Sequence, residues 1–150
     1  MSEESLLQEF KEDFALFIEA GFIAVKQLDE IAARRLFKTA ELLNPDNPAS
    51  QLGLGYIALN KLQVSEATKI FEAITKKDPS HHLAEALLGI CCMLTRGKMK
   101  KGEKLIADAK AKTQDPTIKN LADVCMEWAE KDLKVKTTSL LVPTKADEEE

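Results

Sequence analysis

The residues of this sequence that could do chemistry are two adjacent histidines, three cysteines and several separated carboxylates. His81 and His82 could ligate a metal, but a tetrahedral site needs further ligands at a suitable spacing, and the sequence supplies none. We therefore interpret the pair as part of a surface turn. The carboxylates form no recognisable acid–base pair, and P-loop, GxSxG and HExxH motifs are missing. The sequence predicts a non-enzymatic chain with no metal and no cofactor. The carboxylates in question are Asp29, Glu30, Glu72 and Asp78.

The cysteines indicate a reducing compartment. Cys91 and Cys92 are adjacent, and neighbouring side chains on a helix point in different directions, so the two are poorly placed to form a disulfide with each other. Cys125 makes the number odd. The opening residues also lack the basic and apolar regions of a secretory signal. We expect a cytoplasmic protein whose cysteines pack as small apolar side chains.

Composition favours a soluble helical domain. Of the 150 residues, 45% are hydrophobic and 31% are charged, and only six are glycine and five proline. Without the acidic residues 147–150, acidic and basic residues balance at 21 each. This balance gives no general case for binding to nucleic acid or a membrane surface. No run approaches the 18 apolar residues of a membrane span.

An internal repeat with a period of 34 residues organises the chain. Small residues recur where two helices must approach closely, bulky residues where a gap must be filled, and prolines where a helix must end. A third copy needs one extra residue, so that Gly102, Ile106 and Ala109 take the positions of its second helix. The recurring residues are Gly21, Gly55 and Gly89; Ala33 and Ala67; Phe37 and Phe71; Pro45 and Pro79.

These positions resemble the tetratricopeptide repeat (TPR), in which helix pairs stack into a right-handed superhelix with a concave groove. We expect an all-α fold of three such pairs plus a capping helix. The repeats span about 14–47, 48–81 and 82–116, the cap spans 116–134, and together they form a domain over 1–136. Residues 137–150 are expected to be a disordered acidic tail. The expected helices are 5–25, 29–43, 48–62, 65–77, 81–97, 98–112 and 116–134. The cap would cover the third repeat with Leu121, Val124, Cys125, Trp128 and Leu133.

The first helix of each repeat would line the groove, and its inward positions are apolar throughout. TPR modules that grip acidic C-terminal tails carry Lys, Asn and Arg there, so a carboxylate clamp is not expected. An apolar groove suits an amphipathic helix of a protein partner. The predicted groove residues are Ile18, Phe22, Val25, Leu52, Tyr56, Leu59, Leu83, Ala86, Ile90 and Met93, with Ala15 and Ala49 at its start.

Other uses of these surfaces stay open at this point. The first or last helix could fold back into the groove, or two copies could form a homodimer through it. A basic stretch from Arg96 to Lys112, with seven basic and two acidic residues, could dock an acidic partner in a permanent scaffold. No aromatic residues interleave with these charges, which disfavours nucleic acid.

Two further stretches resemble one particular TPR family. They are Leu94-Thr95-Arg96-Gly97 and Gln114-Asp115-Pro116-Thr117-Ile118, the second followed by an apolar closing helix. Together with three degenerate repeats they resemble the TPR-type chaperones of bacterial type III secretion, most closely those of the needle subunit. The resemblance implies a client whose amphipathic helix lies in the groove and a small helical co-chaperone on the outside. The related chaperones of translocator proteins, which often dimerise, are the alternative.

Overall fold

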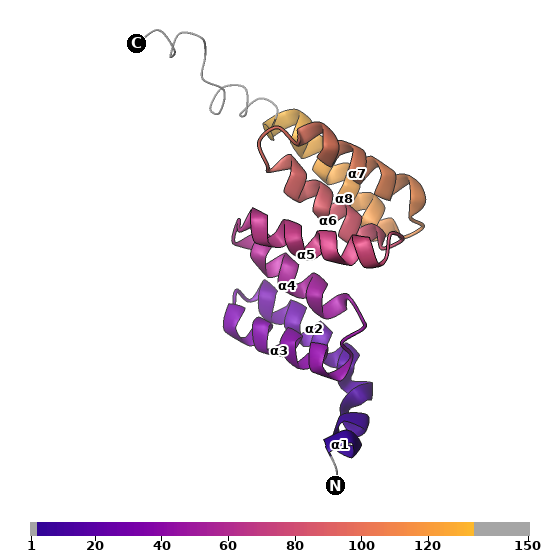
Figure 1. Cartoon of the computed structure of the whole chain (residues 1–150). Helices are drawn as coiled ribbons and strands as arrows, with labels where there is room; N and C mark the ends of the chain where they lie inside the picture. The colour runs from indigo at the N-terminus through magenta and orange to yellow at the C-terminus, as the bar shows by residue number, and fades with distance from the viewer. Residues whose placement is uncertain (1–2, 134–150) are drawn as a thin grey trace. The chain divides into compact units, whose positions relative to one another are not determined.

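The computed structural model describes residues 3–133, and all regular elements in that range are helical (Figure 1). The expected disordered tail, residues 137–150, lies outside the described residues. The elements are α1 (Glu3–Phe10), a 3₁₀ turn η1 (Lys11–Asp13), α2 (Phe14–Lys26), α3 (Glu30–Leu43), α4 (Ala49–Asn60), α5 (Val64–Lys77), α6 (His82–Met93), α7 (Met99–Lys112), α8 (Pro116–Trp128) and a π-helical turn η2 (Ala129–Leu133).

The helices follow the repeat, which confirms the expectation of an all-α helical-repeat fold. The pairs α2–α3, α4–α5 and α6–α7 are each packed together, and α8 packs on α6 and α7. Two boundaries differ from expectation. The helix expected over 5–25 is interrupted by η1, and the helix expected over 81–97 ends at Met93. The residues from Leu94 to Lys98 instead form a turn in which Gly97 has a φ of 78°, so the extra residue of the third repeat lies in this turn.

The chain divides into two compact units, Met1–Pro79 and Ser80–Glu150. Unit 1 contains α1 to α5, and unit 2 contains α6, α7, α8 and η2. The periodic glycines explain the helix packing inside each unit. In unit 1, a Cβ atom on Gly21 would lie 2.6 Å from the nearest carbon of the Phe37 ring. A Cβ on Gly53 would also clash with that ring. Phe37 is therefore fully buried in a slot whose walls exist only because both residues lack a side chain.

The same device recurs in the other two pairs. A Cβ on Gly55 would lie 2.7 Å from Phe71. In unit 2, a Cβ on Gly89 would lie 2.6 Å from Ile106 and 2.9 Å from the carbonyl oxygen of Gly102. The three pairings of a small residue with a large one, predicted from the period, are thus present in all three repeats.

Polar side chains fix where four of the helices begin. Each accepts a hydrogen bond from a free backbone N–H of the first turn, which is the usual role of an N-cap residue. His81, interpreted from the sequence as part of a surface turn, is half-buried and caps α6. The bonds are Ala32 N to Asp29 Oδ1 (3.0 Å), Ala49 N to Asn47 Oδ1 (3.0 Å), Ala84 N to His81 Nδ1 (3.2 Å) and Thr117 N to Asp115 Oδ1 (2.8 Å).

Two leucines, 34 residues apart, end the first helices of repeats one and two in the left-handed conformation. Leu28 has a φ of 61° and Leu62 a φ of 57°. At the first of these turns, Asp29 N donates to Ala24 O, and the hydrogen bonding follows the Schellman pattern that usually places glycine at this position. The two side chains are 92% and 72% exposed, so burial does not compensate for the strain.

We predict that Leu28→Gly and Leu62→Gly each stabilise the protein by about 0.5–1 kcal/mol, because glycine relieves a left-handed strain larger than its own entropy cost. Urea unfolding followed by circular dichroism measures the change. Ile23→Gly is the control, because Ile23 lies in the interior of α2 and is also exposed. There glycine should destabilise by about 1 kcal/mol or more. Destabilisation at all three positions would show that the two turns are not strained.

Candidate protein-interaction surface

Unit 1 carries an apolar face formed by α2 and α4, which pack against each other. Ile18, Phe22 and Val25 of α2 are half-buried and rest on the core cluster that contains Phe37 and Ile57. Their inner edges are therefore fixed by packing, while their outer edges stay accessible. We call this surface, made of Ile18, Phe22, Val25 and Tyr56, the A-face.

An edge-to-face aromatic series stiffens the A-face. The Phe22 ring lies 5.0 Å from the Phe37 ring at 71°, and 6.1 Å from the Tyr56 ring at 68°. Both geometries are the favoured ones for aromatic pairs. Tyr56 ends the series and is 36% exposed. Because Phe37 is fully buried, the series connects the protein core to an exposed, pre-oriented phenol.

The predicted groove residues differ in their accessibility. Leu52, Ala86 and Met93 are buried, at 8%, 1% and 4% exposure, and offer little surface to a ligand. The others are half-buried or, for Tyr56, exposed. Leu59 is half-buried on α4, and Leu83 is half-buried on α6. The accessible predicted residues that the structure brings together are therefore those of the A-face.

In unit 2, α8 covers two of the predicted groove positions. Met93 belongs to a core cluster with Ile106 and the buried face of α8, and Ile90 packs against the same cluster. The sequence left open whether the last helix would occupy the groove. At these two residues of the third repeat, it contributes to the cover.

Sequence reasoning missed the outer apolar residues of α2. Leu16 and Ile23 are 62% and 48% exposed, and their spacing of seven residues places them on one side of the helix. The period of 34 drew attention to positions shared by all repeats. The signal that would have found Leu16 and Ile23 is the helical spacing of apolar residues within this one segment, taken without reference to the repeat.

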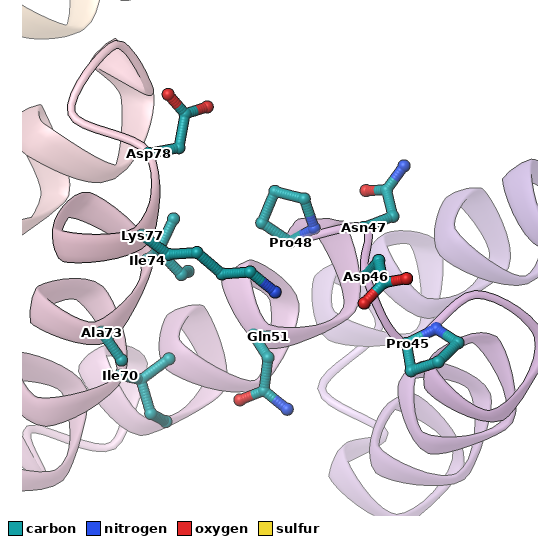
Figure 2. A pocket seen from close by; sticks show the side chains of 10 residues that line it. All are labelled: Pro45, Asp46, Asn47, Pro48, Gln51, Ile70, Ala73, Ile74, Lys77 and Asp78. Carbon is teal, nitrogen blue, oxygen red and sulfur yellow. The ribbon is translucent and has the colours of Figure 1, made fainter.

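A separate cleft of about 400 Å³ lies in unit 1 between α5 and the loop that joins α3 to α4 (Figure 2). Ile70, Ala73 and Ile74 give it an apolar wall, and Lys77 extends from α5 toward the side of Pro48. It is lined further by Pro45, Asp46, Asn47, Gln51 and Asp78. Gln51 and Tyr56 are about 140° apart around the axis of α4, so the cleft and the A-face occupy different sides of that helix.

An ion-pair group lies at the edge of the A-face. Glu30 accepts from Arg34 Nε at 3.0 Å and from Lys61 Nζ at 3.1 Å, and it lines a small hollow with Val25 and Leu28. Hydrogen bonds from Arg34 and then Lys61 lower the pKa of the Glu30 carboxyl. The group links α3 to the end of α4, but its exposure to solvent makes it a minor contribution to stability.

The groups that could do chemistry are not arranged as a reactive site. Cys91, Cys92 and Cys125 are buried, and burial raises the pKa of the Cys125 thiol, which makes its thiolate less available. Between residues 3 and 133, no three His, Cys, Asp or Glu side chains gather as metal ligands would. In the same range, none of the helices combines the length and apolarity that crossing a bilayer requires.

Comparison with known proteins supports the repeat alone. Residues 24–91 match the family model described as tetratricopeptide repeat. No curated protein and no solved structure matches the chain. Tetratricopeptide repeats are modules of protein–protein interaction, and the matched segment contains Val25 and Tyr56 of the A-face.

Proposed function

We propose that this chain is a binding protein that holds the apolar side of a partner's amphipathic helix on the A-face. The observation that carries the proposal is the rigid aromatic series ending at Tyr56. A helix in an apolar groove is a common mode of peptide recognition, and aromatic anchors fixed by their neighbours lose little entropy on binding. Burial of a few hundred Å² at about 25 cal/mol per Å² would supply several kcal/mol before ordering costs.

The resemblance to type III secretion chaperones supports a more specific assignment. The client would be the needle subunit, held in the bacterial cytoplasm in its monomeric form. Binding removes the monomer from polymerisation by mass action. The exposed side of α2, with Leu16 and Ile23, would suit a small helical co-chaperone. A translocator protein as client, with the chaperone as a homodimer, is the alternative within the same system.

Titration of the full chain with a synthetic peptide tests this assignment. The peptide carries the C-terminal helix of a type III needle subunit, and isothermal calorimetry with native mass spectrometry reads out affinity and stoichiometry. We expect a one-to-one complex in the micromolar range or tighter. A peptide of the same composition with its apolar residues scrambled should not bind. Equal binding of both peptides, or of neither, would contradict the needle assignment.

A scaffold function is the second candidate, because one end of α7 presents a cluster of positive charge to solvent. Lys100, Lys101 and Lys104 are exposed, whereas Lys110 pairs with Asp123. Lys112 approaches Glu85 to 3.8 Å near the other end of the helix. An acidic partner could dock on the three exposed lysines in a permanent assembly.

Charge reversal separates the two candidates. We expect the triple variant Lys100→Glu, Lys101→Glu and Lys104→Glu to bind the needle-subunit helix within about twofold of the parent, since exposed substitutions away from a site have small effects. Calorimetry at two salt concentrations measures this. Loss of a native partner complex in the triple variant, with helix binding unchanged, would favour the scaffold.

A further inference from the structure

α8 leaves an apolar stripe uncovered in unit 2. One side of this helix joins the core cluster with α6 and α7. A neighbouring stripe consists of Leu121, Val124 and Trp128, whose spacing places them on one side of the helix. Leu121 is half-buried, Val124 is 61% exposed and Trp128 is 37% exposed. We call these three residues the α8 stripe.

The stripe is not what a capping helix should present to solvent. From the sequence, Val124 and Trp128 were expected to cover the third repeat, but they face away from it. Stacked repeats require a terminal element whose outer side is polar. A hollow of about 410 Å³ beside the first two turns of α8, lined by Pro116, Thr117, Asn120, Leu121 and Val124, shows that the surface has room for another segment.

The segment that follows η2 has the composition to fill this place. Residues 134–150 are mostly polar or charged, and their one continuous apolar run is Leu140–Val142, followed by Pro143. Leu140 is seven residues beyond Leu133, a distance of at most about 25 Å for extended chain. The stripe itself extends only about 10 Å along the helix axis, so the run can reach all of it.

Charge supports the same placement. Residues 147–150 are acidic, and the helices beside the stripe expose lysines on their outer sides. Lys104 of α7 and Lys119 of α8 are exposed, and Lys112 has only a long approach of 3.8 Å to Glu85. A segment that returns along α8 would bring its acidic end past these lysines, where opposite charges attract.

We propose that Leu140–Pro143 docks on the α8 stripe and closes the open end of unit 2. A tether of a few residues holds the run near the stripe at an effective concentration on the order of millimolar, so even a weak apolar contact is populated. The docked segment would also deny the stripe to other chains. A second copy of the chain lacks this advantage at ordinary protein concentrations.

Trp128 provides the test, because it is the only tryptophan of the chain and lies inside the proposed contact. Acrylamide quenching of its fluorescence is measured in the full chain and in the double variant Leu140→Asp, Leu141→Asp. Loss of two buried leucines should lower the ratio of docked to free segment by at least about tenfold. Quenching should therefore rise. Val124→Asp, a change at an exposed position of α8, should raise it from the other side of the contact.

Thr137→Asp with Thr138→Asp is the matched control, since it adds the same charge to the same segment without touching the apolar run. It should leave quenching unchanged, with circular dichroism the same in all variants. Equal quenching in the parent and in Leu140→Asp, Leu141→Asp would overturn the proposal. A parent whose quenching falls as protein concentration rises, with a doubled mass by sedimentation, would instead assign the stripe to a second copy and also overturn it.

Discussion

Phe37→Ala is expected to lower the free energy of unfolding by about 3–5 kcal/mol, the range found when a large buried aromatic side chain is removed. The ring is completely buried, and it contacts Gly21 of its own helix pair as well as Gly53 of the next. The two backbones that flank the ring cannot close over the cavity without disturbing both pairs. Urea unfolding of the parent and the variant, followed by circular dichroism, measures the loss.

Gly53→Ala tests the same slot from the opposite direction. In an open helix position this change would stabilise by about 0.5–1 kcal/mol. Here the added methyl group meets the Phe37 ring, and overpacking should destabilise by about 1–3 kcal/mol instead. The double variant Gly53→Ala, Phe37→Leu should lose less than the sum of the single variants, because the smaller side chain makes room. Stabilisation by Gly53→Ala alone would show that the ring can move aside freely.

The slot also illustrates how far sequence reasoning reaches. The pairing of Gly21 with Phe37 was predictable because close helix approach and gap filling impose the same residue types in every repeat. Gly53 was not predicted, although it contacts the same ring. It has no glycine counterpart one period away, because the corresponding residues are Glu19 in the first repeat and Leu87 in the third. A contact made in only one repeat leaves no periodic signal.

Local breaks in the repeat were equally invisible to periodicity. The η1 turn interrupts a stretch whose composition favours continuous helix, and Leu28 occupies a turn position where glycine would be expected. In both cases tertiary packing and hydrogen bonding override local preference. The candidate site was predictable as a set of apolar positions, but not as a surface. Whether a position is accessible depends on what packs over it, as the contrast between Leu52 and Tyr56 shows.

This contrast decides which variant can test the proposed function. From the sequence, glutamate at either position would be expected to block binding, because both residues were predicted to line the groove. Leu52→Glu would place a carboxylate in a buried site and should unfold unit 1 rather than report on binding. Tyr56→Glu changes a residue whose outer edge is exposed, and it removes one aromatic pair worth about 0.5–1.5 kcal/mol. The protein should therefore stay folded.

Tyr56→Glu is expected to weaken binding of the needle-subunit helix by about 30-fold or more, since loss of an anchoring tyrosine costs about 2 kcal/mol or more. The new carboxylate adds to this loss, because a bound apolar helix would desolvate it. Calorimetry with the peptide measures the affinity. Leu42→Glu is the matched control, because Leu42 is 75% exposed on α3 and outside the A-face. If both variants bind like the parent while remaining folded, the helix does not lie on the A-face.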